Sequence, residues 1–297
     1  MVRKPTPTPT RASKTGKASI AIVGAGSLAA FLSVALGESG YIVSEIISRD
    51  APNSRRQART LAARVGAQAV AAQSATLDAD LIWFCVPDRE IRTVAISLAK
   101  RGVSKIKYAL HSSGALLSRE LDPLRKAGVA VASVHPLMTF VAGAHPSLKD
   151  VPFAIEGDAA ATRVAQKIVR DLGGESFALP ASRKAAYHTW ATMTSPLLLA
   201  FLVTLEEAAR AAGLNRGDAR RMSMPIIQQT LRNYARLGPA PSFSGPLVRG
   251  DVDTVAKHLS VLKKNSQARE VYVALARTAL RGLPVKNRRE IKRLLED

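Results

Sequence analysis

Polar side chains that could bind or protonate a ligand follow three apolar runs of the sequence. Val86-Pro87-Asp88 follows the first run, His111-Ser112-Ser113-Gly114 the second and His135-Pro136-Leu137 the third. Any single histidine among them could be an ordinary hydrogen-bonded loop residue. Ligands of open α/β sheets, however, bind beyond the carboxyl ends of the strands. If the three runs are strands of one sheet, these clusters converge on one edge and favour a shared site.

A glycine turn near residue 24 has the spacing of a phosphate-binding loop. The residues Gly24-Ala25-Gly26-Ser27-Leu28-Ala29 read G-x-G-x-x-A. Gly24 and Gly26 allow a tight turn and a close approach of backbone amides to a pyrophosphate at a helix N-terminus, while Ala29 lets helix and strand pack closely. The motif is weak alone, but here it joins a predicted strand to a predicted helix, and a second strand follows. A glycine turn without a ligand is the alternative.

The end of that second strand, Ser48-Arg49, selects between the two nicotinamide cofactors. An acid there would accept hydrogen bonds from the ribose 2′-hydroxyl of NAD, whereas a base accommodates the 2′-phosphate of NADP. Three further arginines follow within the next ten residues, and a guanidinium fork suits a phosphate. We therefore expect NADP rather than NAD. Asp50 lies one position late for the acid role, and a merely solvated basic helix is the alternative to a phosphate site.

The elements that would hold these residues alternate between strands and helices. Apolar runs are predicted to be strands at residues 18–23, 42–47, 69–70, 81–86, 108–110 and 130–134. Helical patterns fall between them at residues 30–39, 57–65, 91–100 and 117–127, and a last strand, helix and strand span residues 153–178. The run at 81–86 shows no alternation, as expected when both sheet faces are covered. The pattern predicts an α/β fold with a doubly wound, Rossmann-like parallel sheet.

Beyond residue 180 the pattern becomes almost entirely helical. Helices are predicted at residues 184–212, 216–237, 253–265 and 266–281, with breaks at Gly238-Pro239-Ala240-Pro241 and Ser244-Gly245-Pro246. The first helix is apolar on most faces, so we expect a second copy of the chain to cover it in a homodimer. We divide the chain into a tail (1–17), a dinucleotide-binding domain (18–180) and an all-α domain for substrate binding and dimerisation (181–297).

Length, charge and cysteine content narrow the class of protein. The 297 residues suit two packed units. The single cysteine, Cys85, excludes an internal disulfide and a thiolate metal cluster, so we predict no metal site and a reducing, cytoplasmic location. The net charge of +20 could serve nucleic acid, but aromatic residues are only 5% and no basic stripe interleaves with them, which argues against specific nucleic-acid binding. The longest apolar run, residues 196–205, is short of the roughly 20 residues of a membrane span, so we expect no membrane partner.

Residues 1–17 differ from the rest of the sequence. They contain five basic residues, no acid and a Pro-Thr repeat that cannot bury apolar surface. This composition predicts a disordered basic tail. It could also resemble an organelle transit peptide, but the Pro-Thr repeat is incompatible with an amphipathic helix.

Taken together, the motifs resemble a bacterial family. The glycine turn, Val86-Pro87-Asp88, His111 to Ala115, His135 to Phe140, Tyr187-His188 and the segment S-G-P-L-V-R-G-D from Ser244 with His258 are similar to Rossmann-like proteins whose C-terminal half is domain of unknown function number 2520. The resemblance covers residues 18–281, and Ser244 stands where the family usually has threonine. The family is similar to the group of pyrroline-5-carboxylate reductase, 6-phosphogluconate dehydrogenase and deazaflavin-dependent NADP reductase. That implies a nicotinamide domain followed by a helical dimerisation domain.

The resemblance also implies where a proton donor stands. In the related dehydrogenases it lies on the first long helix of the second half, so His188 is the candidate acid or base there, with Lys184 as the alternative. Their spacing of four residues places both on one helix face. A helix start with a solvent-facing pair would explain the same pattern without catalysis.

The remaining assignments complete the predicted site. His111 and Ser113 are grouped with the catalytic residues, and His135, Asn233 and Arg249 with substrate binding. Arg249 could instead pair with Asp251 to hold its loop, the interpretation that we favour slightly. The predicted cofactor-binding residues are Gly24, Gly26, Ser27, Leu28, Ala29, Ser48, Arg49, Val86, Pro87 and Asp88.

These observations favour an NADP-binding oxidoreductase that moves a hydride to or from a small, anionic carbonyl or imine compound. A nicotinamide-binding sensor or assembly partner without turnover is the alternative, because a dinucleotide fold does not by itself establish chemistry. A basic nucleic-acid binder is a third hypothesis, with no recognition motif to support it. Only the oxidoreductase requires a proton donor in the site.

Overall fold

The structure, a computed structural model, describes residues 16–144 and 146–296 and divides into two compact units. The first unit ends at Ala191 and the second begins at Thr192. This boundary comes later than residue 180, where we expected it, because helix α6 (Lys184–Thr194) buries Lys184 and Tyr187 in the first unit. The predicted tail lies outside the described residues, apart from its last two positions.

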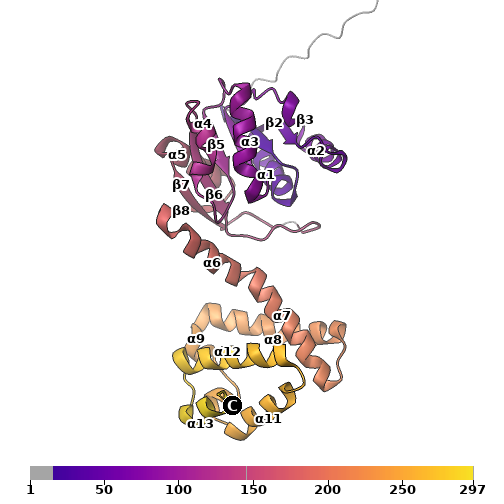
Figure 1. Ribbon diagram of the computed structural model, residues 1–297, viewed down its shortest axis with the longest axis vertical. Helices are drawn as coiled ribbons and strands as arrows, with labels where there is room; N and C mark the ends of the chain where they lie inside the picture. Colours follow the sequence, from indigo (N-terminus) through magenta and orange to yellow (C-terminus); the bar gives the residue numbers. More distant parts are fainter. Residues whose placement is uncertain (1–15, 145, 297) are drawn as a thin grey trace, which may run out of the picture. The chain divides into compact units, whose positions relative to one another are not determined.

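An eight-stranded sheet forms the centre of the first unit (Figure 1). Its strands are β1 (Ser19–Val23), β2 (Ile42–Ser48), β3 (Gln68–Ala71), β4 (Leu81–Phe84), β5 (Tyr108–His111), β6 (Ala130–Pro136), β7 (Pro152–Gly157) and β8 (Glu175–Ala178). Their order is β3-β2-β1-β4-β5-β6-β7-β8, and every neighbouring pair is parallel except β6 and β7. The expected parallel sheet therefore has one exception. A loop, rather than a crossover helix, joins β6 to β7, and neighbouring strands joined in this way run antiparallel.

Helices cover both faces of the sheet. The apolar sides of α1 (Ser27–Glu38), α2 (Pro52–Val65) and α5 (Ala159–Asp171) pack in one core, and those of α3 (Asp88–Arg101) and α4 (Asp122–Arg125) in the other. Strand β4 contributes to both, because Leu81 and Trp83 lie in the first core and Ile82 and Phe84 in the second. This two-sided burial explains its apolar sequence without alternation.

The helix expected at residues 117–127 is shorter than predicted. A 3₁₀ turn, η2 (Ser118–Leu121), and the single turn of α4 replace it. The Glu156 carboxylate accepts hydrogen bonds from the Ser118 backbone N–H and hydroxyl, at 2.5 and 2.9 Å. This contact from a distant strand fixes the start of the segment, while Leu121 and Leu124 still fill the core.

The second unit is helical in all its regular elements. They are α7 (Pro196–Ala209), the 3₁₀ turn η4 (Arg210–Ala212), α8 (Arg216–Leu237), α9 (Pro239–Ser242), α10 (Pro246–Arg249), α11 (Val252–Leu262), α12 (Ser266–Gly282) and α13 (Arg288–Leu294). The first unit contains two further 3₁₀ turns, η1 (Ala72–Ser74) and η3 (Ala181–Arg183). The single helix predicted for residues 184–212 is interrupted at Ser195, whose φ and ψ are −125° and −71°. Pro196 causes the break, because a proline disfavours helical geometry in the residue before it.

Helices α7 and α8 leave large apolar side chains exposed in the single chain. They include Leu197, Leu199 and Val203 on α7 and Ile226 and Leu231 on α8. The helical stretch Ala181–Ala212 is long and apolar enough, by length and composition alone, to cross a membrane, and none of its most apolar window is buried. The prediction of no membrane partner rests only on the apolar run at 196–205, which is shorter than this stretch.

Candidate functional site

The glycine turn lies between the carboxyl ends of β1 and β4. Gly24 has a φ of +114°, and a Cβ there would lie 2.3 Å from the carbonyl oxygen of Cys85, so only glycine fits. Gly26 precedes α1, and a Cβ added to it would meet nothing within 4 Å. No side chain among the described residues caps this helix N-terminus, so the backbone amides of Ser27 and Leu28 are available to an anion. Ala29 is fully buried, as close packing requires.

Ser48 and Arg49 lie at the end of β2, as predicted. Ser48 is buried, whereas the Arg49 side chain is 66% exposed and pairs with Glu90 of α3 at 3.2 Å. Asp50, the acid that could have bound the ribose 2′-hydroxyl of NAD, pairs instead with Arg55 at 3.0 Å. The exposed guanidinium of Arg49 can bind a phosphate, and the Glu90 carboxylate would compete for it.

His111 and Ser113 organise the loop after β5. His111 is fully buried, its Nδ1 accepts the backbone N–H of Ser113 at 3.2 Å, and its Nε2 therefore carries the proton and donates to the Leu117 carbonyl at 3.0 Å. Burial lowers the pKa of His111 to about 4, which keeps it neutral. The Ser113 hydroxyl donates to Asp88 at 2.8 Å and accepts two backbone N–H groups of its own loop. Both side chains therefore hold the loop through these hydrogen bonds, and their catalytic role stays a prediction.

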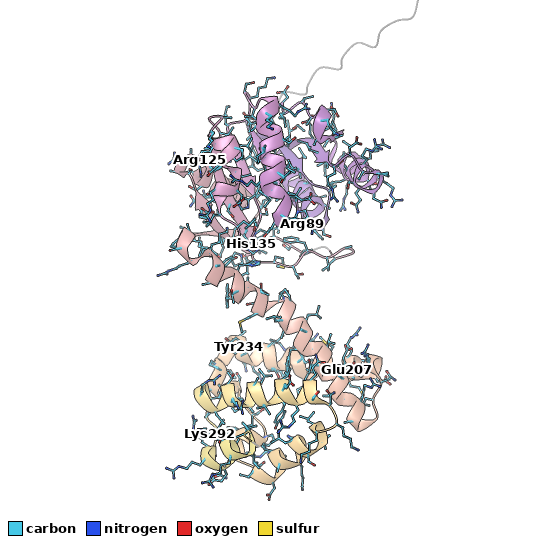
Figure 2. All side chains as sticks on the ribbon, viewed as in Figure 1. Arg89, Arg125, His135, Glu207, Tyr234 and Lys292 are labelled. Atoms are coloured by element: carbon cyan, nitrogen blue, oxygen red, sulfur yellow. The ribbon has the colours of Figure 1, made fainter. Side chains whose placement is uncertain are left out.

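His135, Tyr187 and His188 meet beside Gly114. The His135 Nδ1 lies 2.8 Å from the Tyr187 hydroxyl. The rings of His135 and His188 are nearly perpendicular, with centroids 6.0 Å apart. A Cβ on Gly114 would lie 2.8 Å from His135 Nε2 and 2.4 Å from His188 Cδ2. Figure 2 shows His135 and Arg89, near the start of α3, towards the same end of the strands. Two predicted site residues, His135 and His188, are therefore brought together.

Lys184 is buried next to this cluster. It is 1% exposed, and its Nζ donates to the Ser133 hydroxyl, which in turn donates to the Ser113 carbonyl at 3.2 Å. Burial lowers the pKa of Lys184 to about 8, while the charges of Glu156 and Asp88 act in the opposite direction. A side chain this deeply buried offers almost no surface to a ligand. In this structure Lys184 contributes a buried hydrogen bond and a charge next to the cluster, and its role as the alternative acid or base stays a prediction.

Asn233 and Arg249 belong to the second unit. Asn233, on α8, accepts a hydrogen bond from Gln229 at 2.7 Å. Arg249 pairs with Asp251 at 2.8 Å, which is the loop-holding interpretation that we favoured. The site described here is built from the first unit alone.

The sequence analysis did not assign two residues that belong to the cluster. Tyr187 lies three residues after Lys184, and this spacing on one helix turn was a signal that the two could share a face. Ser133 is the one polar residue of the strand segment at 130–134, and a polar residue inside an apolar strand was the signal there. Glu90 carried no such signal, because its pairing with Arg49 joins two separate elements.

A separate cavity of about 550 Å³ lies along α1, and Ser27, Phe31, Arg64 and Leu148 are among its lining residues. It includes Ser27 of the glycine turn but none of the residues around His135. We therefore assign the chemistry to the strand edge and not to this cavity.

Two family models match the chain. A Rossmann-like domain matches residues 4–136, and the domain of unknown function 2520 matches residues 151–279. No curated protein matches the chain. The two models agree with the sheet of the first unit and with the change to helices in the second half.

Solved structures share this architecture. A Bacteroides fragilis protein described as an NADP oxidoreductase is 21% identical, covers 88% of this chain and 97% of its own, and has a TM-score of 0.72. A Thermotoga maritima protein is 24% identical, with coverages of 93% and 98% and a TM-score of 0.68. Pyrroline-5-carboxylate reductase from Coxiella burnetii is 14% identical, with coverages of 93% and 98% and a TM-score of 0.58. At these identities the likeness establishes the fold.

Proposed function

Because this chain belongs to the proteins that join a Rossmann-like domain to the domain of unknown function 2520, we propose that it is an NADP-dependent oxidoreductase acting on a small, anionic carbonyl or imine compound. One observation carries the proposal. The glycine turn before α1 and the cluster of His135, Tyr187 and His188 belong to the same carboxyl edge of one sheet. A dinucleotide bound by its phosphates at such a turn extends along that edge.

The residues present fit a phosphorylated dinucleotide. Gly24 and Gly26 would hold the pyrophosphate against the start of α1, and Arg49 would bind the 2′-phosphate. The open space at Gly26 and the exposure of Arg49 support this assignment. The description of the Bacteroides relative as an NADP oxidoreductase agrees with it. The cofactor, when bound, supplies or accepts the hydride.

His188 is the proton donor in this proposal. It is partly buried, and its ring packs beside that of His135 against Gly114. Hydride addition to a carbonyl develops negative charge on oxygen, and a donor placed there lowers the barrier. The hydrogen bonds of His111 and Ser113 hold the loop that contains Gly114. The buried Lys184 contributes a positive charge that acts on His135.

Cofactor choice is tested by measuring dissociation constants of NADPH and NADH at fixed salt. Arg49→Ala should weaken NADPH binding by about 1.5 to 3 kcal/mol and NADH binding much less, because a charge-assisted phosphate contact is lost. Glu90→Gln should strengthen NADPH binding, because it removes the competing carboxylate. Arg163→Ala, on the exposed side of α5, controls for net charge. Equal losses for both cofactors would contradict the NADP assignment.

The chemical role is tested with His188→Ala. The variant should bind NADPH like the wild type but lose about 100-fold to 10,000-fold in turnover, the usual effect of removing a general acid. The measurement is NADPH oxidation over a panel of small oxo acids and cyclic imino acids. Wild-type protein that binds NADPH tightly but turns over none of them would favour the non-catalytic sensor.

A further inference from the structure

The hydrogen bond between Tyr187 and His135 fixes which ring nitrogen of His135 carries its proton. Tyr187 is 8% exposed, and burial raises its pKa to about 12, so its hydroxyl keeps its proton. A buried O–H must donate to an acceptor, and the structure provides the His135 Nδ1 at 2.8 Å. Nδ1 is therefore the acceptor, and in a neutral ring the proton resides on Nε2.

His135 remains neutral in this environment. Burial, with the positive charges of Lys184 and His188, lowers its pKa to about 4. Groups facing the cluster come from several elements: Lys184, Tyr187 and His188 from α6, His111 from β5, Asp88 from α3 and Glu156 from β7. The two carboxylates are bonded to Ser113 and Ser118 respectively. The charges that act on His135 itself are positive.

The Nε2 atom of His135 lies against Gly114. Any side chain at this position would collide with His135 Nε2 and with the His188 ring, at 2.8 and 2.4 Å. Gly114 does not have a positive φ, so closeness to the two rings, rather than backbone geometry, requires glycine here. The absence of a side chain lets both imidazoles pack against Gly114, and both histidines remain partly exposed.

We propose that Tyr187 is a positioning residue that holds His135 as a neutral Nε2–H donor, so that the site accepts a carbonyl or carboxylate oxygen rather than a protonated amine or iminium. The inference rests on the proposed function and narrows its substrate class by excluding protonated imines. An oxygen acceptor gains a hydrogen bond from Nε2–H and is attracted by Lys184. A protonated amine has no lone pair to offer and meets positive charge.

The first test reads the tautomer directly. Nitrogen NMR of full-length protein labelled in its histidines distinguishes protonated from unprotonated ring nitrogens, and His135→Gln identifies the His135 signals by their loss. At pH 6 to 8 we expect an unprotonated Nδ1 and a protonated Nε2. Tyr187→Phe, which preserves the ring, should let both tautomers populate while circular dichroism remains unchanged. A protonated Nδ1 in the wild type would overturn the proposal, as would an unchanged tautomer in a folded Tyr187→Phe.

The second test uses acetate and acetamidinium, which have the same planar shape and opposite charge. With NADPH-saturated protein, acetate in the millimolar range should shift the His135 Nε2 resonance, and acetamidinium should shift it at least tenfold less. An equal response to both probes, or none to either, would overturn the assignment of an oxygen-accepting site. NADPH binding is measured on the same sample. Its absence would refute the proposed function, whereas the tautomer experiment would stand or fall separately.

Discussion

At the scale of single residues, burial decides what each ionisable side chain can do. His111 and His135 are alike in sequence, each following an apolar strand, but His111 uses both ring nitrogens inside the protein. His135 uses one and presents the other beside Gly114. Lys184 and His188 share a helix face, yet Lys184 is 1% exposed and His188 only partly buried. Accessibility therefore separates residues that position the site from those that can touch a ligand.

The buried charge of Lys184 predicts a dependence of stability on pH. Its pKa is about 8 in the folded protein against an ordinary value of 10.5. Between these values the unfolded chain binds a proton that the folded protein lacks, so the free energy of unfolding rises with pH. Lys184→Met removes this contribution. From pH 8 to pH 10 the wild type should gain about 2 kcal/mol relative to the variant, measured by urea unfolding.

The control for this prediction is Lys100→Met, which removes an exposed lysine from α3. The difference between this variant and the wild type should stay nearly constant over the same pH range. A constant difference for Lys184→Met as well would mean that Lys184 titrates alike in the folded and unfolded chains. That result would contradict the lowering of the Lys184 pKa by burial.

At the scale of elements, the two glycines of the turn before α1 separate folding from binding. Gly24→Ala forces a Cβ against the Cys85 carbonyl at a φ of +114°, so it should destabilise the protein by about 1 to 3 kcal/mol. Gly26→Ala meets no neighbour and should leave the thermal unfolding temperature unchanged. It should nevertheless weaken NADPH binding, because its methyl group occupies the space proposed for the pyrophosphate. A Gly26→Ala variant that binds NADPH as tightly as the wild type would contradict the assignment of this turn as the pyrophosphate-binding site.

Local patterns predicted the elements well, and contacts between distant residues account for the differences. The bounds of α8 match the prediction because Asn215 caps its start, with its side chain accepting the N–H of Asp218, and Gly238 follows its end. The helix at 117–127 was overestimated because Glu156 holds Ser118 from another strand. The sheet was expected to be parallel throughout, but β7 is antiparallel to β6 because a loop, and not a crossover helix, joins the two strands.

The candidate site follows the same rule. Convergence at one edge was predictable, since parallel strands present their carboxyl ends together. The pairing of Lys184 with Ser133 joins residues 51 positions apart, and no local spacing encodes it. The neutral state of His111 and His135 also arises from burial in the folded unit. Residue type thus predicted candidates, while their roles depended on tertiary contacts.

At the scale of the whole molecule, the exposed apolar face of the second unit requires an explanation. We propose that a second copy of the chain covers it. Leu197, Leu199 and Val203 of α7 are about half exposed or more, and Ile226 of α8 is 70% exposed. Tyr234 of α8, labelled in Figure 2, is also exposed. Stable dimers bury about 1,600 Å² in total, and apolar burial contributes about 25 cal/mol per Å². Two neighbouring helices with this composition offer a surface of the required kind.

A homodimer is therefore the expected state at micromolar concentration, measured by light scattering after size-exclusion chromatography. Each chain has a net charge of +20, so added salt should strengthen association by screening the repulsion between copies. Leu199→Glu or Ile226→Glu should produce monomers, because a buried unpaired carboxylate opposes association. Ile96→Glu, an exposed apolar position on α3 of the first unit, should leave the dimer intact. If the wild type is a monomer and co-floats with phosphatidylcholine vesicles in a density gradient, Ala181–Ala212 binds a membrane instead of a second chain. A wild-type monomer that does not co-float with the vesicles would contradict both the dimer and the membrane assignment.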